Sequence, residues 1–154
     1  MMPHTTAHVI AVSVSTQKGQ KKINVPSGKI LPELGFEGDA HAANWHRMVS
    51  LLAIESIQKI RDKGLSVHPG DFAENITTEG VELWALPIGT RLQIGQEALL
   101  EVTQIGKECH NRCAIFHQVG DCVMPREGIF ARVLKGGEIR PGDRVEILET
   151  ADAL

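Results

Sequence analysis

The fold class is decided by the stretch Thr90-Arg91-Leu92-Gln93-Ile94-Gly95-Gln96-Glu97-Ala98-Leu99-Leu100-Glu101-Val102-Thr103-Gln104-Ile105. Its two arms, Thr90–Ile94 and Ala98–Ile105, have the composition of strands, and Gly95-Gln96-Glu97 between them is a turn signal. Two strands with a short glycine-containing connection predict an antiparallel hairpin. The centre of the chain is therefore predicted to be β-structure.

Further strand signals stand on both sides of this hairpin. The segment His8–Ser15 is rich in β-branched residues, and Arg47–Ala53 has the apolar composition of a buried strand. Towards the C-terminus, Gly128–Leu134 and Arg144–Leu148 predict two more strands. The turn signals between these two strands are Lys135-Gly136-Gly137 and Pro141-Gly142-Asp143.

Helical signals are short. Ile54, Ile57 and Ile60 fall on one stripe of a helix predicted over Ile54–Lys63, and Asn111–Val119 predicts a second short helix. Three glycine- or proline-containing segments are predicted to be loops or turns, namely Gln17–Ser27, Gly35–His41 and Pro69–Phe72. The whole pattern favours a mostly β protein with one or two short α-helices, built as a mostly antiparallel β-barrel that is closed or partly open.

Length and composition predict one domain over residues 1–154, with its core at about 8–149. A net charge of −3 argues against nucleic acid as the partner, and six aromatic residues argue against a base-stacking surface. No apolar run is long enough to span a bilayer, and the N-terminus lacks a secretory signal pattern. With an odd number of cysteines, three, we expect a reduced, cytoplasmic protein without a membrane partner.

Two of the three cysteines lie together in Lys107-Glu108-Cys109-His110-Asn111-Arg112-Cys113-Ala114-Ile115-Phe116. A thiolate attacks, carries sulfur or binds a metal, and neighbouring cations favour this ionised form. Zinc held with His117 and Cys122 is an alternative, but the paired Cys-x₂-Cys knuckles of structural zinc sites are absent. Both cysteines can also be small buried apolar residues, although the polar surroundings favour a functional thiol.

Three further groups carry chemistry less specifically. Asp39, His41 and His46 could bind a metal or act as acid and base on a glycine-containing loop, and Asp39 could also hydrogen-bond its own turn. From the residues alone, a tight turn is predicted for Pro69-Gly70-Asp71-Phe72 and the following Glu74-Asn75. A cationic rim for an anionic ligand could be formed by Lys107, Arg112, Arg126 and Arg132. Motifs for nucleotide hydrolysis, zinc proteolysis and lipase chemistry are absent.

The order of several segments resembles the MOSC family, the domain named for the C-terminus of molybdenum-cofactor sulfurase. The similarity runs from about Ile10 to Ile147 and is closest to small stand-alone bacterial members. The resembling segments are Gly35-Phe36-Glu37-Gly38-Asp39-Ala40-His41, Pro69-Gly70-Asp71-Phe72-Ala73-Glu74-Asn75-Ile76, Leu86-Pro87-Ile88-Gly89-Thr90, Gly106-Lys107-Glu108-Cys109-His110 and Gly120-Asp121-Cys122-Val123-Met124-Pro125-Arg126-Glu127-Gly128.

The resemblance implies a β-barrel, a key cysteine and a link to the molybdenum-pterin cofactor. The family's cysteine follows an arginine, which here matches Arg112-Cys113, so Cys113 is preferred as the catalytic thiol and molybdenum ligand, with Cys109 as the alternative. The cofactor-binding residues that it implies are Lys107, Arg112, Arg126, Asp39, His41, Asp71 and Asn75. No pyridoxal phosphate is expected on this chain, because the desulfurase half of the sulfurase is not in the sequence.

Three functions follow as hypotheses from the resemblance. The first is a sulfur carrier or cofactor-handling protein that receives sulfur from a cysteine desulfurase-type donor or works with molybdenum-cofactor biosynthesis proteins. The second is a small molybdenum-cofactor-dependent reductase of N-hydroxylated compounds. The third is a non-enzymatic module that binds the pterin cofactor or a partner. The oligomeric state is left open.

Overall fold

The computed structural model describes residues 7–16, 21–40, 48–106 and 124–148. Along the first half of the chain the strands are β1 (Ala7–Val14), β2 (Ile23–Val25), β3 (Gly28–Leu31), β4 (Gly35–Phe36), β5 (Val49–Ala53) and β6 (Ile76–Glu79), with helix α1 (Ile54–Arg61) between β5 and β6. The second half contains the 3-10 helix η1 (Leu83–Ala85), β7 (Arg91–Ile94), β8 (Ala98–Ile105), helix α3 (Met124–Glu127), β9 (Ile129–Lys135), β10 (Gly137–Ile139) and β11 (Arg144–Ile147).

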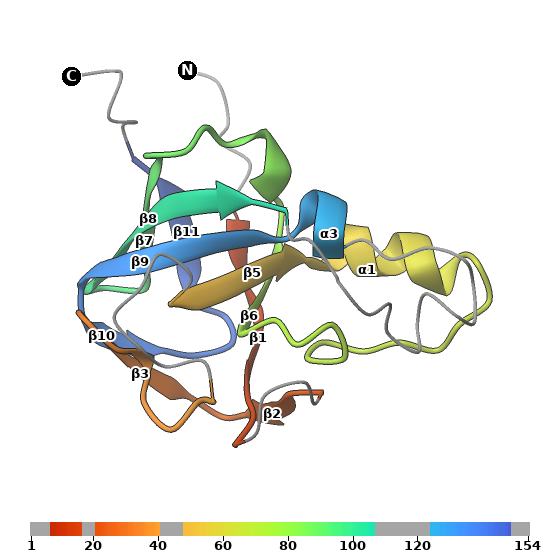
Figure 1. The fold of residues 1–154 in the computed structure, drawn as a ribbon, viewed down its shortest axis with the longest axis horizontal. Coiled ribbons are helices and arrows are strands. Elements are labelled where there is room, and N and C mark those ends of the chain that lie inside the picture. Colours follow the sequence, from red (N-terminus) through yellow and green to blue (C-terminus); the bar gives the residue numbers. More distant parts are fainter. Residues whose placement is uncertain (1–6, 17–20, 41–47, 107–123, 149–154) are drawn as a thin grey trace.

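Seven strands close into a barrel (Figure 1). The order around it is β1, β11, β7, β8, β9, β5 and β6, and β6 returns to β1. The β1–β11 pairing of Ala7 with Val145 closes the ring, and β2 is added at the other end of β1. Closure pairs the barrel strands on both sides, so none of them is left with an open edge. The predicted β-barrel and its central hairpin, β7–β8, are confirmed.

One pairing in the barrel is parallel. Leu51 of β5 lies beside Ile76 of β6, and the chain crosses between these strands through α1. A parallel pair needs such a long connection. The predicted antiparallel arrangement therefore has its exception at this pair. The reason is visible in β5, whose five residues are all buried, because the barrel interior covers one face and the α1 layer the other.

A second, smaller sheet has the order β10-β3-β4. It corrects two expectations: Gly35–Phe36 is a short strand rather than a loop, and Gly137 begins β10 rather than separating two strands. Glycine is needed at this crossing because a Cβ atom on the neighbouring Gly136 would lie 2.7 Å from the Ile30 carbonyl oxygen. Within the segment predicted as a loop or hairpin connection, Ile23–Val25 forms β2.

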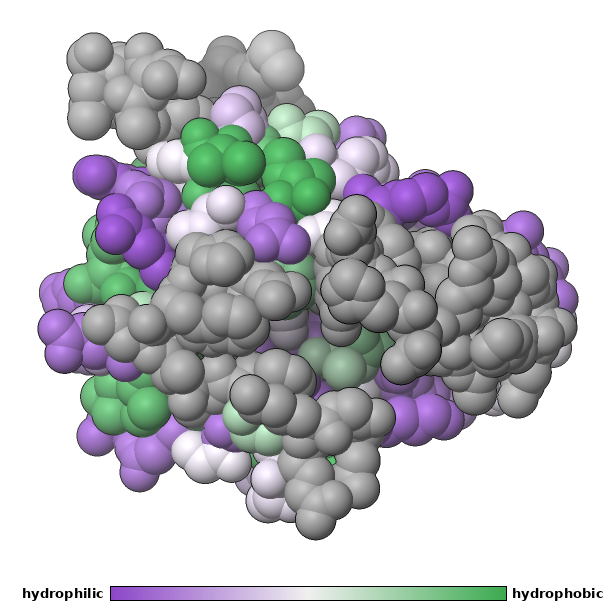
Figure 2. All heavy atoms as spheres, viewed as in Figure 1, coloured by the Kyte–Doolittle hydropathy of each residue, from purple (hydrophilic) through white to green (hydrophobic). Residues whose placement is uncertain are grey.

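Apolar side chains are divided between two clusters. The larger cluster fills the barrel and includes Leu51, Leu100 and Ile129, and the smaller one packs under α1 around Ile57 and Phe72. Where the described residues are visible on the face drawn in Figure 2, hydrophobic residues form separate patches among polar ones. None of the described helices has the length and apolar composition that a bilayer crossing requires.

Candidate functional site

A fully buried ion pair lies at the end of the barrel where β1 stops. The Lys22 ammonium Nζ donates to Asp39 Oδ1 over 2.7 Å, and both side chains are 0% exposed. Ser15, just after β1, contacts both partners: its backbone N–H donates to Asp39 Oδ1 and its hydroxyl accepts from Lys22. The backbone N–H of Ala40 donates in turn to the Ser15 carbonyl. These contacts attach the glycine-containing loop of Asp39 to the end of β1.

The carboxyl group of Asp39 is held in its ionised form. Burial raises its pKa, but the hydrogen bond and charge of Lys22, the N–H of Ser15 and the Asn75 amide lower it, and the net pKa is below the ordinary 3.8. A buried charge is tolerated only when it is paired and hydrogen-bonded. The pair is therefore a permanent charged element of the protein at neutral pH.

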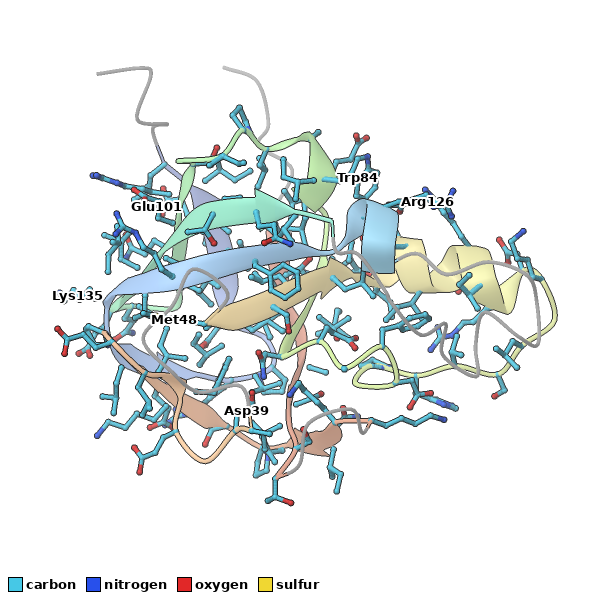
Figure 3. The ribbon with its side chains drawn as sticks, in the orientation of Figure 1. Asp39, Met48, Trp84, Glu101, Arg126 and Lys135 are labelled. Atoms are coloured by element: carbon cyan, nitrogen blue, oxygen red, sulfur yellow. The ribbon has the colours of Figure 1, made fainter. Side chains whose placement is uncertain are left out.

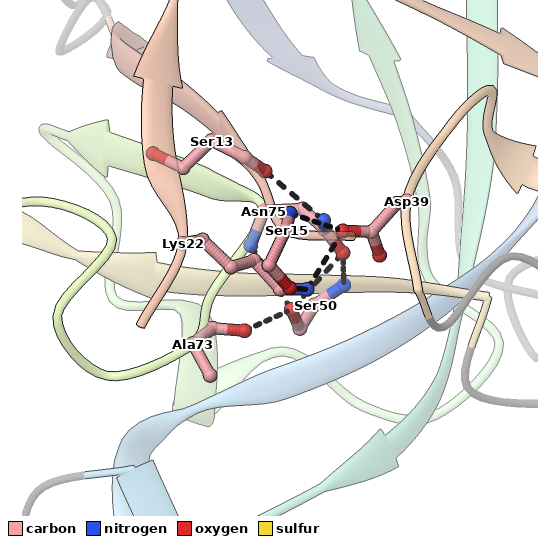
Figure 4. A network of polar contacts seen from close by, with 7 residues as sticks. All are labelled: Ser13, Ser15, Lys22, Asp39, Ser50, Ala73 and Asn75. Carbon is pink, nitrogen blue, oxygen red and sulfur yellow. Dashed lines mark hydrogen bonds and ion pairs between the residues drawn. The ribbon is translucent and has the colours of Figure 1, made fainter. Parts of the chain in front are cut away.

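Asn75 joins the same group of residues to three barrel strands (Figure 4). Its amide oxygen accepts from the backbone N–H and the hydroxyl of Ser50 in β5. Its amide NH₂ donates to the carbonyl of Ser13 in β1, and its own backbone N–H donates to the Ser50 hydroxyl. Both ends of the buried amide are thus used within the protein, at the point where β6 begins.

The turn before Asn75 is fitted closely to Lys22. Gly70 has φ +95°, and a Cβ atom there would lie 2.4 Å from the Lys22 carbonyl oxygen. The Lys22 backbone N–H donates to the Gly70 carbonyl over 2.9 Å. Only glycine fits both the backbone conformation and this close approach. Asp71 is half-buried and accepts the His68 backbone N–H, so its carboxylate completes its own turn.

Glu74 is the second buried carboxyl group in this region, and it has no cation among its described hydrogen-bond partners. It accepts from the backbone N–H of Phe72 and from the hydroxyl of Thr77. Burial raises its pKa from 4.5 to about 7, because the backbone N–H groups and the Thr77 hydroxyl compensate only part of the desolvation. The group can therefore gain or lose a proton near neutral pH.

Arg126 lies in a different part of the molecule. It is exposed on α3, beside α1, whereas Asp39 lies near β2 and β3 (Figure 3). The next residue, Glu127, is buried and accepts from the Ser56 hydroxyl at 2.6 Å and from Lys59 Nζ at 2.8 Å. Lys59 also lies over the Trp84 ring, 5.0 Å from its centre. These contacts fasten α3 to α1 and η1.

The structure brings together Asp39 and Asn75 of the predicted cofactor-binding set. Asp71 is bonded to His68 within the turn that precedes Asn75, and Arg126 lies on α3 in another part of the molecule. The predicted thiols Cys109 and Cys113, with Lys107, Arg112 and His41, lie outside the described residues. His46, His117, Cys122 and the helix predicted over Asn111–Val119 also lie outside them. Within the described part of the chain, no three His, Cys, Asp or Glu side chains meet as a possible metal site. The roles of these residues stay predictions.

Sequence reasoning missed three members of the buried group, namely Lys22, Ser15 and Ser50. Lys22 lies in a polar segment, where a lysine is expected to be exposed to solvent. Its neighbours Lys21 and Ile23 give no signal that it is an interior residue. The two serines lie at strand positions where small polar residues carry no specific signal. Only the pairing of β1, β5 and β6 shows that these residues converge.

The described residues can be compared with what binding of the molybdenum-pterin cofactor, implied by the resemblance, would require. Asp39, Lys22 and Asn75 are buried in contacts with one another or with the backbone, so in this geometry they support the site region from within. Arg126 is an exposed residue, and its guanidinium is a group that matches phosphate geometry. Among the described residues of the predicted cofactor-binding set, Arg126 has the one cationic side chain.

Comparison with known proteins finds solved structures that are similar to this chain over most of its length. The crystal structure of YuaD from Bacillus subtilis matches 96% of this chain and 98% of its own, with a TM-score of 0.77 and 18% identity. YiiM from Geobacillus stearothermophilus matches 93% of this chain and 75% of its own, with a TM-score of 0.69 and 21% identity. YiiM from Escherichia coli matches 95% and 71%, with a TM-score of 0.67 and 21% identity.

These structures share the fold, and at this identity they show the fold alone. No curated protein sequence matches the chain. The family model of the MOSC domain matches residues 38–146, which is more than half of the 154 residues. The chain belongs to the MOSC domain family.

Proposed function

We propose that this protein handles sulfur for the molybdenum cofactor, or the cofactor itself, through a reactive cysteine. Cys113 is the preferred thiol and Cys109 the alternative. The observation that carries the proposal is the MOSC match, because residues 38–146 include every predicted site residue from Asp39 to Arg126. Membership of the family suggests a function related to the molybdenum cofactor, and the cysteine-containing segment supplies the chemical group.

The described residues on both sides of the cysteine-containing segment are bonded to other parts of the fold. β8 ends at Ile105, opposite Ile129 of β9, and the Gly106 backbone N–H donates to the Gly128 carbonyl over 2.7 Å. At the other end, α3 is fastened through Glu127 to Ser56 and Lys59.

The proposal assigns different tasks to the predicted residues. Cys113 would accept sulfur or bind molybdenum, and the cations Lys107 and Arg112 would favour its thiolate. Arg126 would attract the phosphate of the pterin. When bound, the cofactor would supply a redox-active metal. The partner would then be a cysteine desulfurase-type sulfur donor or a protein of molybdenum-cofactor biosynthesis.

Mass spectrometry of the protein after incubation with a cysteine desulfurase and free cysteine tests the carrier role. The donor's persulfide passes its outer sulfur to the thiolate of this protein, which leaves a thiol on the donor and a persulfide here. We expect one added sulfur atom, mapped to Cys113. Its absence from both Cys113 and Cys109 removes the carrier role.

Three matched variants sharpen this experiment. Cys113→Ser should abolish the added sulfur, whereas Cys122→Ser, which changes the third cysteine, should leave it in place. Loss in Cys109→Ser with retention in Cys113→Ser moves the role to Cys109. For cofactor binding, anaerobic loading followed by metal analysis should show less molybdenum on Cys113→Ser than on the original chain. Equal retention favours a binding module without a cysteine ligand.

A further inference from the structure

The turn from His68 to Asn75 has a backbone that depends on its hydrogen bonds. Gly70 and Ala73 both have positive φ, +95° and +63°. For alanine this conformation is strained, because its Cβ atom comes too close to the following carbonyl oxygen. The carboxyl group of Glu74 lies inside the turn, 0% exposed, and accepts the Phe72 backbone N–H at 3.2 Å and the Thr77 hydroxyl at 2.9 Å. The strained turn is thus folded around one carboxyl group.

We propose that Glu74 is a proton-sensitive group that sets the hydrogen bonds of the His68–Asn75 turn and transmits its charge state to the Lys22–Asp39 pair. The structure provides two short connections for this coupling. The Gly70 carbonyl accepts the Lys22 backbone N–H, and the residue after Glu74 is Asn75, which is bonded to Ser50 and Ser13. The proposal does not depend on the chemistry of the cysteines.

The chemical basis is the hydrogen-bonding inventory of a carboxyl group. An ionised carboxylate only accepts, which suits the N–H and O–H donors that surround Glu74. A protonated carboxyl group must donate its own hydrogen, so one of its oxygens no longer serves these donors equally. Uptake of a proton from solvent therefore forces the donors around Glu74 to rearrange, and the strained Ala73 lies directly beside them.

Other charged groups lie on the elements packed around the turn. On the turn itself are Asp71, which accepts the His68 N–H, and the exposed His68. On the β1 and β2 side lies the Lys22–Asp39 pair. From the end of α1, Arg61 reaches the Val67 carbonyl over 2.9 Å. Burial raises the pKa of Glu74 to about 7, within the range where a cell's pH can change its charge.

Nuclear magnetic resonance of the full chain tests the proposal. The side-chain carboxyl carbon of Glu74 and the backbone amides of Phe72 and Lys22 are followed from pH 3 to 9, a range that includes both the ordinary pKa of 4.5 and the raised pKa of about 7. We expect all three to titrate with one common midpoint near 7. A Glu74 midpoint at its ordinary value of 4.5 overturns proton sensitivity, and a Lys22 amide that does not follow Glu74 overturns the coupling.

Two variants and one control complete the test. In Glu74→Gln the common transition at Lys22 and Phe72 should disappear. Thr77→Val removes one donor and keeps the carboxyl group, so the midpoint should move to higher pH, and this variant serves even where Glu74→Gln does not fold. His68→Gln removes the imidazole from the turn and should leave the transition unchanged. A transition that vanishes in His68→Gln assigns it to His68 and overturns the proposal.

Discussion

Asp39 and Glu74 lie at the same end of the barrel and are both withdrawn from water, but their partners differ. Asp39 is bonded to the Lys22 ammonium, and its pKa is lowered below 3.8 despite burial. Glu74 is bonded to the neutral donors of Phe72 and Thr77, and burial raises its pKa to about 7. The two carboxyl groups are therefore shifted in opposite directions, and a cation is among the partners of Asp39 but not among the described hydrogen-bond partners of Glu74.

The two groups therefore change stability with pH in opposite directions. The folded protein binds a proton on Asp39 less readily than the unfolded chain, so this contribution is present above the ordinary value of 3.8 and is lost as the pH falls. Glu74 binds a proton more readily when folded. Its contribution is fully present below 4.5 and is lost as the pH rises through about 7.

Removal of the cation should have the largest effect. Lys22→Met leaves Asp39 as a buried charge without its partner, and we expect a loss of about 3–5 kcal/mol in the free energy of unfolding. Urea unfolding at pH 7 measures it. Lys21→Met is the matched control, because Lys21 is exposed beside it in the sequence. Equal stability of both variants would contradict the structural role of the pair.

Replacement of both partners sharpens the same comparison. In Lys22→Met with Asp39→Leu no unpaired charge is left in the interior, so part of the lost stability should return. The recovery is incomplete because the Ser15 N–H loses its acceptor. A double variant less stable than Lys22→Met alone would show that the lysine, rather than the unpaired carboxylate, causes the loss.

The titrating carboxyl group should produce the next largest effect. A pKa shift from 4.5 to about 7 corresponds to roughly 3 kcal/mol. We expect the original chain to lose about this much stability between pH 4.5 and 8 relative to Glu74→Gln, in which the group cannot ionise. Chemical unfolding of both proteins across this range measures the difference. A difference that does not change with pH refutes the assignment.

The contact between the two regions is tested at Gly70. Gly70→Ala should lower the free energy of unfolding by about 1–3 kcal/mol more than Gly64→Ala, because only at Gly70 does the added Cβ atom clash with a neighbour. The control has nearly the same φ, +96° against +95°, but a Cβ atom added to Gly64 would meet nothing within 4 Å. Thermal and urea unfolding give the two losses. Equal losses would mean that backbone conformation alone, and not the approach to the Lys22 carbonyl, requires glycine.

The local elements of the barrel could be predicted because their signals are local. The hairpin of β7 and β8 and the isoleucine stripe of α1 are patterns within one short segment. Strands β2 and β10 have only three residues each, which is too short for such a pattern. The parallel pairing of β5 with β6 depends on the path of the chain through α1. Closure through β1 and β11 joins residues from the two ends of the chain.

The candidate site likewise contains some residues that could be predicted from the sequence and others that could not. Asp39 is marked in the sequence by its glycine-containing loop, and Asn75 is named through the family resemblance. The structure brings these two residues into one region. Lys22 carries no such mark, because its burial depends on the distant Gly70 and Asp39 rather than on its neighbours. The sequence predicts Glu74 only as part of a turn, because its unusual pKa is caused by burial, which the neighbouring residues do not show. Such properties arise from contacts between segments.

The central functional claim is a reactive thiol at Cys113, and site-resolved labelling tests it most directly. The folded protein is treated with a limiting amount of a thiol reagent at neutral pH, and peptide mapping gives the order in which Cys109, Cys113 and Cys122 react. We predict that Cys113 is modified first and at a rate above that of the same cysteine in urea. Modification of Cys113 only after unfolding would contradict the account.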